Sequence, residues 1–331
     1  MFGSGKSIED WAKELQGRAS QQHDYVADSR SMSITTGTVD PDAPGKLDDR
    51  SSLDLDGIGS FAMDDRAHRQ MAHSLKIDKR FYDRMRKDHP DVFDHTVNAL
   101  MDREPKKRMV RTSGDSARAI LSERYRVMDH MQIAEAVLPV IAERSDMVVH
   151  SCAVTDSRMY LKALFPETSA IITTVKNQKR PVQAGLSISN SEVGSGSVMF
   201  EFLVYELLCS NGMIGLNSFR RNHLGRAFGG SEDHPEALEY FRDDTLKADD
   251  KALMLKIQDM CRAAITGDGF QRSVDSLQSS TEDRINGDPV KAVEEVQSRF
   301  NLLDNERSSV LSHLIEGGDL SRYGMIQAVT R

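Results

Sequence analysis

The chain has little cysteine, a single tryptophan and no long apolar run in its 331 residues. The cysteines, Cys152, Cys209 and Cys261, are far apart and odd in number, so a disulfide framework is not expected and a reducing compartment is the simplest interpretation. No apolar stretch reaches the roughly 18 residues that a membrane-spanning helix needs, and residues 1–10 lack the hydrophobic region of a signal peptide. We therefore expect buried thiols, no membrane partner and a cytoplasmic location.

The composition is that of a folded protein. Hydrophobic residues make up 39% of the chain and charged residues 28%, close to globular averages, which argues against wholesale disorder. A chain of 331 residues exceeds the usual size of one domain, so two domains, or one domain with helical extensions, are expected.

The charge is unevenly distributed. The net charge of −8 alone argues against a nonspecific nucleic-acid binder, but residues 1–102 carry −5, residues 103–226 carry +5 and residues 227–331 carry −8. A basic centre between acidic flanks suits an anionic partner that docks at the middle. It equally suits ion pairs between the centre and the flanks, including pairs between subunits.

The N-terminal third is predicted to be mainly helical. Ser7 is a good N-cap, and Trp11 with Leu15 forms the apolar stripe of a helical arm that ends near residue 22. Apolar residues are sparse over 23–59, which reads as a turn-rich linker. Apolar residues at helical spacing then predict three short helices within residues 64–101.

The period changes to that of β-strands near residue 106. A Ser-Gly-Asp turn at residues 113–115 separates two apolar segments and predicts a hairpin. Residues 182–189 alternate strictly, as a half-solvated antiparallel strand should, and residues 198–208 are apolar enough for a central strand. The other expected elements are strands at 147–154 and 159–165, a helix at 133–141 that Pro139 kinks or shortens, and helices at 237–241, 251–264, 289–300 and 305–315.

Together these patterns predict an α+β fold, with a central antiparallel β-rich domain that contains hairpins, flanked by N-terminal and C-terminal helical segments. The expected divisions are a helical arm and flexible linker at residues 1–59, an α+β core with the basic β-rich centre at 60–234, and a helical C-terminal region at 235–331.

No catalytic or metal-binding motif stands out. His68 and His73 are five residues apart and His89 and His95 six, so neither pair has the i,i+4 spacing that places two metal ligands on one helical face. No nucleophile signature surrounds the serine, cysteine or histidine residues. We expect no metal and no cofactor, and we favour a non-catalytic role while leaving enzymatic activity open.

The most informative chemical pattern is a series of basic residues interleaved with aromatic residues in the β-rich centre. If these residues converge on a groove, the basic groups follow a phosphate backbone while Tyr125 or Tyr160 stacks on bases. The alternative is ordinary surface residues that form ion pairs with the acidic flanks. The candidate nucleic-acid contacts are Arg108, Arg111, Arg118, Arg124, Tyr125, Arg126, Tyr160, Lys176, Lys179, Arg180, Arg220, Arg221, His223 and Arg226.

Residues 66–75 and 79–87 also have the layout of a helix-turn-helix. In that arrangement Lys79, Arg80, Arg84, Arg86 and Lys87 would reach DNA. Helical hairpins that only pack against a core are far commoner, so packing is the favoured interpretation.

Four segments resemble a known family. They are LSERYRVMD at residues 121–129, SNSEVGSG at 189–196, LCSNGM at 208–213 and GGDLSRYG at 317–324. In these segments and their order, the chain from about residue 59 to residue 331 resembles the phage and plasmid proteins that share domain of unknown function 932. The resemblance implies a mobile genetic element in a bacterial host cell, and it carries over no catalytic residue.

The order of helices and hairpins is also similar in outline to phage single-strand annealing proteins, which form oligomeric rings or filaments around a basic groove. The leading hypothesis is therefore a non-catalytic homo-oligomer that binds single-stranded DNA and assists annealing or recombination. Two alternatives stay open. One is a module that binds a host or phage protein, such as an anti-defence factor, and the other is an unrecognised metal-dependent nuclease.

Overall fold

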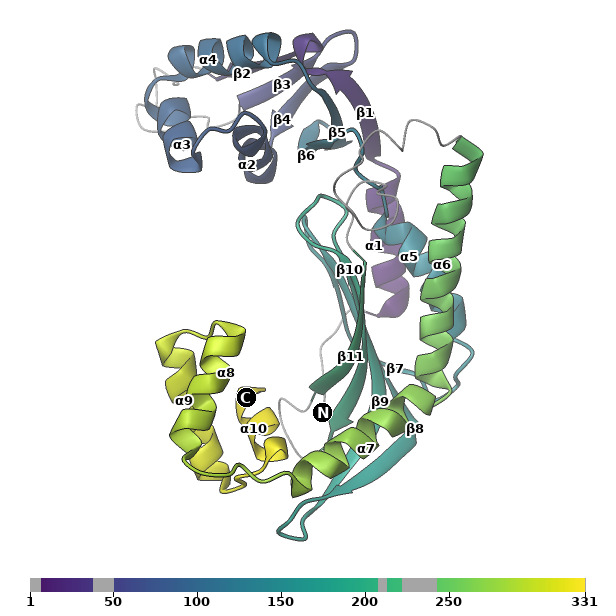
Figure 1. Ribbon diagram of the computed structural model, residues 1–331. Coiled ribbons are helices and arrows are strands. Elements are labelled where there is room, and N and C mark those ends of the chain that lie inside the picture. The colour runs from purple at the N-terminus through teal and green to yellow at the C-terminus, as the bar shows by residue number, and fades with distance from the viewer. Residues whose placement is uncertain (1–6, 38–50, 208–212, 222–242, 331) are drawn as a thin grey trace.

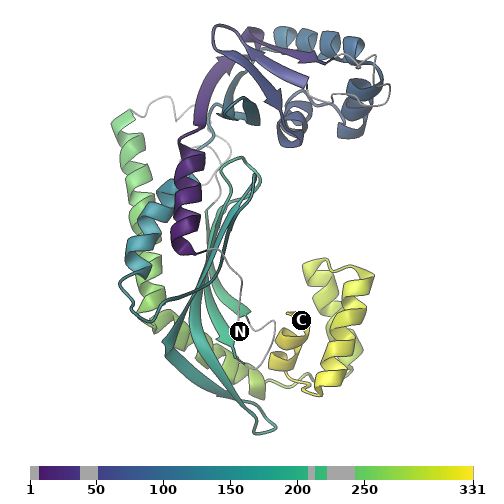
Figure 2. The same cartoon turned by 180° about the vertical axis from the view of Figure 1, so that it is seen from behind.

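The computed structural model describes residues 7–37, 51–207 and 243–330, together with the backbone of residues 213–221. Helices and antiparallel sheets are both present, with helices at both ends, which confirms the predicted α+β class. The chain forms an arc (Figures 1 and 2). An N-terminal lobe and a C-terminal helical unit form its two ends, and a central sheet with its own helices joins them.

The N-terminal lobe contains a six-stranded sheet and three helices. The strands lie in the order β1 (Gln22–Asp28), β5 (Lys107–Ser113), β6 (Ser116–Ser122), β4 (Gly59–Met63), β3 (Ser51–Leu55) and β2 (Met32–Thr36). Only the β4–β6 pair is parallel among these described strands. The helices are α2 (Asp65–Ser74), α3 (Lys79–Asp88) and α4 (Pro90–Arg103), and a short 3-10 helix spans Ser29–Ser31.

The prediction of a linker without regular structure over residues 23–59 was wrong for its described part. Most of β1 and all of β2 and β3 fall in this stretch. Met32 and Ile34 are buried on β2, and Leu53 and Leu55 on β3, while the residues between them are more exposed. This alternation is a strand signal of period two, and serine, threonine and aspartate at the outward positions conceal it in a simple count of apolar residues.

The central sheet is a five-stranded antiparallel meander. Its order is β11 (Met213–Arg221), β10 (Val198–Glu206), β9 (Lys179–Asn190), β8 (Met159–Thr173) and β7 (Val148–Val154). Four helices pack against it: α1 (Ile8–Ala19), α5 (His130–Ile141), α6 (Asp243–Ile265) and α7 (Asp268–Glu282). In both views α1, α5 and α6 lie on the outer side of the arc and the strands line its inner side (Figures 1 and 2).

The strand β9 is more buried than its alternation predicts. Every residue from Ala184 to Asn190 is buried, although a half-solvated strand was expected. The reason lies in its position, because β9 is the middle strand of the sheet and β8 and β10 flank it. At Gly185 a side chain is also excluded, since a Cβ there would lie 2.8 Å from Cδ2 of Leu164 and 3.0 Å from the carbonyl oxygen of Ala163.

The helical arm, α1, packs against the central sheet and not against residues 22–59. The Ser7 side chain caps α1 by accepting from the backbone N–H of Asp10, as the sequence predicts. Trp11 and Leu15 are buried in the core of the central sheet, beside α5 and β7. Pro139 stands in the last turn of α5, which ends at Ile141.

The described cysteines are buried free thiols, as expected. Cys152 lies on β7 and Cys261 on α6, whereas Cys209 lies outside the described residues. Burial raises the pKa of the Cys261 thiol to about 12, so this group is an unreactive part of the core.

The C-terminal helical unit consists of α8 (Pro289–Phe300), α9 (Asp304–Gly317) and α10 (Arg322–Val329). It has a small core of its own around Val293, Leu314 and Met325. Tyr323 of α10 reaches the core of the central sheet instead, so α10 fastens this unit to the rest of the chain.

Candidate functional site

Three predicted phosphate contacts are held in ion pairs and are little exposed. The side chains of Arg111, Arg118 and Arg126 are 2%, 12% and 3% exposed, and each one pairs with a carboxylate. Arg126 bonds to Asp249 and Asp250 of the acidic α6, at 2.8 Å each. The predicted contact between the basic centre and an acidic flank therefore exists, and it lies within one chain.

Arg111 ties four segments together. Its Nε donates to Asp24 of β1 at 2.7 Å, its Nη2 donates to Asp129 before α5 at 2.5 Å, and its Nη1 donates to the backbone carbonyl of Glu192 at 2.6 Å. All three donor nitrogens of the planar group are thus used. The residue joins the sheet of the N-terminal lobe to the central sheet.

Glu192 is the buried acid of the same network. Its side chain is 2% exposed, and Oε1 accepts from Arg118 and from Gln22 at 2.7 Å each. Oε2 accepts from the backbone N–H of His130 at 3.1 Å, while the His130 ring nitrogen Nδ1 lies farther away, at 3.8 Å. The Asn190 amide nitrogen lies 3.0 Å from that same Nδ1, and Arg118 is the closer ionic partner of Glu192, at 2.7 Å.

Two acids of the network, Glu192 and Asp129, have pKa values that are shifted in opposite directions. Burial by itself raises the pKa of Glu192, but the charges of His130 and Arg118 and their hydrogen bonds outweigh it and lower that pKa to about 2. Burial, together with the neighbouring Glu192 and Asp24, raises the pKa of Asp129 although Arg111 lowers it. Glu192 is therefore the carboxylate whose ionised form stabilises the contact between the sheet of the N-terminal lobe and the central sheet, which we call the joint.

The depressed pKa of Glu192 predicts a loss of stability in acid. A carboxylate of ordinary pKa 4.5 in the unfolded chain and about 2 in the fold contributes about 3 kcal/mol above pH 4.5, and this contribution is lost as the pH falls towards 2. Urea unfolding from pH 6 to pH 2 measures it. The difference between the wild type and Glu192→Gln should be largest above pH 5 and should shrink towards pH 2.

The matched control is Glu123→Gln at an exposed position, whose unfolding curves should run parallel to those of the wild type. A constant difference between the wild type and Glu192→Gln at every pH would show that this carboxylate does not have a depressed pKa.

Two of the segments that carry the family resemblance meet at this network. Residues 121–129 and 189–196 pack together, and the Tyr125 hydroxyl donates to the carbonyl of Ser191 at 3.3 Å. Val193 is fully buried in the small core between them. The motif residues there have a structural task, which is to hold the two sheets against each other.

The other candidates of the first group lie near this joint. Arg108 is half-buried on β5, and Arg124 is exposed in the turn after β6. Tyr125 is half-buried, and burial raises the pKa of its hydroxyl. Of the residues predicted here, only Arg124 is an exposed cation.

The candidates of the later groups are dispersed. Lys176 and Lys179 are exposed at the β8–β9 hairpin, and Arg180 is half-buried beside them. Arg220 lies on β11, where the register pairs it with Met199 of β10, and Arg221 is the last residue of β11. The side chains of Arg220 and Arg221 are outside the described part of the structure, as are His223 and Arg226 altogether. Those of the predicted residues whose side chains the structure describes do not form one groove.

An exposed aromatic residue lies on the inner face of the central sheet. Tyr160 on β8 is 38% exposed, and it is flanked by core residues that point to the helix-covered face. Lys162, two residues further, shares its face and is half-buried. The register aligns Tyr160 with Ser189 and Lys162 with Ser187, so small polar residues lie next to both side chains.

A second basic and aromatic surface lies on α3. Arg80, Arg84 and Lys87 are exposed there, and Phe81 is 47% exposed. The Arg84 guanidinium lies 5.5 Å from the centre of the Phe81 ring. In both views α2 and α3 lie on the side of the N-terminal lobe that faces the C-terminal helices (Figures 1 and 2). Tyr82 and Arg86 of the same helix are buried, so α3 does pack, as the favoured interpretation expects.

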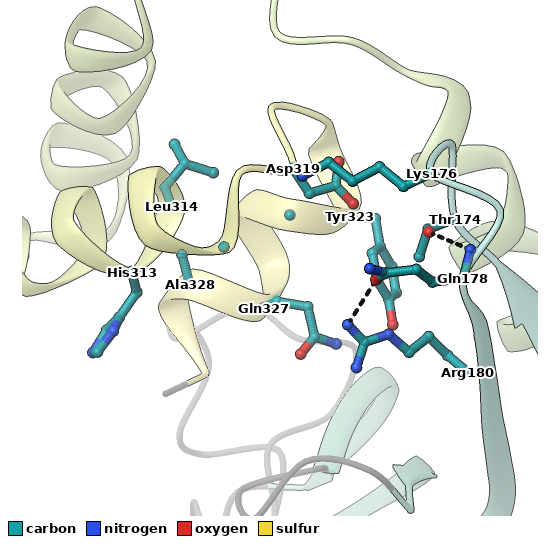
Figure 3. A pocket seen from close by; sticks show the side chains of 12 residues that line it. Thr174, Lys176, Gln178, Arg180, His313, Leu314, Asp319, Tyr323, Gln327 and Ala328 are labelled. Atoms are coloured by element: carbon teal, nitrogen blue, oxygen red, sulfur yellow. Dashed lines mark hydrogen bonds between the residues drawn. The ribbon is translucent and has the colours of Figure 1, made fainter.

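A polar cavity of about 60 Å³ lies between the β8–β9 hairpin and the C-terminal helices. Figure 3 shows Lys176 reaching from the hairpin towards Asp319, and Gln327 pointing towards Arg180. Tyr323 separates the cavity from the core of the central sheet. This site includes the tail segment of the family resemblance.

The floor of the cavity is held by Glu206, whose side chain is 2% exposed. It accepts from Arg180 at 3.2 Å, from the Tyr323 hydroxyl at 3.1 Å and from Gln327 at 2.8 Å. A second nitrogen of Arg180 donates to Gln178 at 3.2 Å. Burial and the neighbouring Glu206 raise the pKa of Tyr323, so its hydroxyl keeps its proton and stays a donor.

Sequence reasoning missed the acids that organise these sites. Glu192, Glu206 and Asp319 were not singled out, because a lone acid in a sequence is usually exposed. The one signal available for Glu206 is its place at the end of an apolar strand, where the alternation directs it into the core.

Within the described ranges, no helix is long and apolar enough to span a bilayer. The same residues include no group of three or more histidine, cysteine, aspartate or glutamate side chains placed to hold a metal ion. Comparison with known proteins finds no matching family model, no similar curated protein and no similar solved structure. The family resemblance of the four segments therefore stays a hypothesis.

Proposed function

We propose that the protein binds single-stranded nucleic acid along the inner side of the arc. The observation that carries this proposal is the exposed Tyr160 beside Lys162, on the face of the central sheet that no described helix covers. An aromatic ring stacks on any base, and a neighbouring cation attracts the phosphate backbone. In the mobile-element setting that the resemblance implies, such binding would assist annealing or recombination without catalysis.

The basic surface on α3 supports the same proposal. Arg80, Arg84 and Lys87 extend the positive charge, and Phe81 offers a second exposed ring. α3 lies on the side of the N-terminal lobe that faces the C-terminal helices, and the strands of the central sheet line the inner side of the arc (Figures 1 and 2). We therefore expect one nucleic-acid strand to reach both surfaces. Lys176 and Lys179 remain candidate contacts, because both are exposed.

The buried arginines are not part of the proposed interface. Arg111, Arg118 and Arg126 have their charge neutralised by carboxylates, and a phosphate could reach them only if these ion pairs broke. Their task is to fix the joint between the sheets and to hold α6, which positions the inner surface.

Removal of the Tyr160 ring should weaken binding of an oligothymidylate. Base stacking on an aromatic side chain contributes about 1–3 kcal/mol, so Tyr160→Ala should raise the dissociation constant by roughly 5- to 100-fold, while Tyr160→Phe should leave it nearly unchanged. Lys162→Glu should also weaken the salt dependence of binding. The slope of log K against the logarithm of the salt concentration should fall by the amount expected for the loss of about one or more phosphate contacts. Fluorescence anisotropy over a salt series measures both quantities.

The matched control is Lys291→Glu, an exposed position on α8 with the same change of charge. It should shift the binding curve much less than Lys162→Glu. No binding by the wild type at low salt, or equal binding by the wild type and Tyr160→Ala, would overturn the proposal.

A further inference from the structure

The cavity beneath the C-terminal helices contains polar groups that the fold leaves without partners. The Nε–H of Arg180 and the Oδ1 oxygen of Asp319 are buried and have no hydrogen-bond partner among the described residues. Both residues line this cavity. A buried donor and a buried acceptor that stay unsatisfied cost about 1–3 kcal/mol each, so a polar occupant that reaches these groups would offset that cost.

Two charged residues that line the cavity also have no ionic partner among the described residues. The cationic Arg180 is balanced by Glu206 at 3.2 Å, but no described residue forms an ion pair with Lys176 or Asp319. One unpaired positive and one unpaired negative charge therefore line one small space. A single anion would satisfy Lys176 and Arg180 and be repelled by Asp319, and a single cation would have the opposite difficulty.

The site is held rigidly. Two nitrogens of Arg180 are fixed by Glu206 and Gln178, so the planar guanidinium, and with it the Nε–H, has one orientation. Gly324 lines the opposite wall, and a Cβ there would overlap the carbonyl oxygen of Asp319. The backbone that carries Asp319 thus packs directly on α10, and its place depends on that contact.

The volume limits the size of the occupant. One water needs roughly 10–15 Å³ of such space, so about 60 Å³ holds about four to six non-hydrogen atoms. We propose that this cavity binds a small zwitterion, with a carboxylate that accepts from Arg180 and Lys176 and an ammonium group that donates to Asp319. Glycine and alanine are the free amino acids that fit this chemistry and size.

This inference does not depend on nucleic-acid binding. The test is calorimetric titration of the full chain with glycine and with L-alanine, supported by thermal unfolding at about 20 mM ligand, where a site with millimolar affinity is largely filled. Sodium acetate and methylammonium chloride, tried separately, each carry one of the two charges. Glycine should bind and raise the unfolding temperature, and the two single-charge compounds should do neither.

The variants assign the contacts. Asp319→Asn should weaken glycine binding by about tenfold or more, because the charge-assisted bond to the ammonium group is lost. Lys176→Gln should weaken it less, and Arg180→Lys provides a second test that keeps the ion pair with Glu206. The control Glu295→Gln is at an exposed position of α8, away from the cavity lining, and should bind like the wild type.

Three outcomes would overturn the inference. If neither amino acid gives heat or a shift of the unfolding temperature, the cavity holds only water. If acetate binds as well as glycine, the site is a plain anion site. If Asp319→Asn folds and binds glycine unchanged, the ammonium contact is wrong.

Discussion

Arg111→Leu should destabilise the protein by about 3–4 kcal/mol, since it removes one partner from a buried ionic network and leaves the others uncompensated. Asp24 and Asp129 would lose their cation, and the carbonyl of Glu192 would lose its donor. These carboxylates are 31% and 28% exposed, so water recovers part of the loss and the lower half of the usual range applies.

Urea unfolding at pH 7 measures this change. The single tryptophan, Trp11, is buried in the core of the central sheet, so its fluorescence reports on that unit, while circular dichroism reports on the whole chain. Because Arg111 connects the two sheets, the variant should also separate the two transitions. Coincident curves and a midpoint like that of the wild type would show that the network contributes nothing.

Arg124→Leu is the matched control for this substitution. Arg124 is exposed just after β6 and loses the same charge, so its effect should stay within about 0.5 kcal/mol. A comparable destabilisation by both variants would mean that positive charge in this region matters and that the buried geometry of Arg111 does not.

The fold was predictable where apolar residues repeat cleanly. The hairpin around Gly114 and the helix after Asp129 appear at the expected residues, because turn and capping residues fix their ends locally. β11 was missed, since Gly215 and Asn217 interrupt any alternation there. α7 was missed as well, although Phe270 and Val274 recur at helical spacing on it.

The role of each arginine could not be predicted from the sequence. Asp24 lies 87 residues before Arg111, and Glu192 lies 74 residues after Arg118, so local charge counting places both arginines in a basic patch. Only the pairing of β1 with β5 and the packing of the β9–β10 connection bring these acids to them. A sum of charges over a segment cannot distinguish an exposed cation from one that a distant carboxylate has neutralised.

In the C-terminal unit, Gly324→Ala should destabilise the fold more than the addition of a methyl group at any other described position. A Cβ at this position would overlap the carbonyl oxygen of Asp319 and lie 2.8 Å from its carbonyl carbon, and both are backbone atoms that cannot rotate away. Overpacking of this kind costs about 1–3 kcal/mol, and at this contact we expect the upper end of that range. Thermal unfolding and the protection of α10 amides from hydrogen exchange should both decrease.

Gly317→Ala is the matched control, because the same methyl group at that glycine, near the end of α9, meets no atom within 4 Å. Alanine is the better helix former by about 0.5–1 kcal/mol, so Gly317→Ala should leave the protein as stable or slightly more stable. Asp319 lines the polar cavity, so Gly324→Ala should displace its carboxylate and abolish glycine binding even where the protein stays folded. Normal stability of Gly324→Ala would show that the segment 319–324 can shift freely, and the rigid wall on which the proposed amino-acid site depends would then be absent.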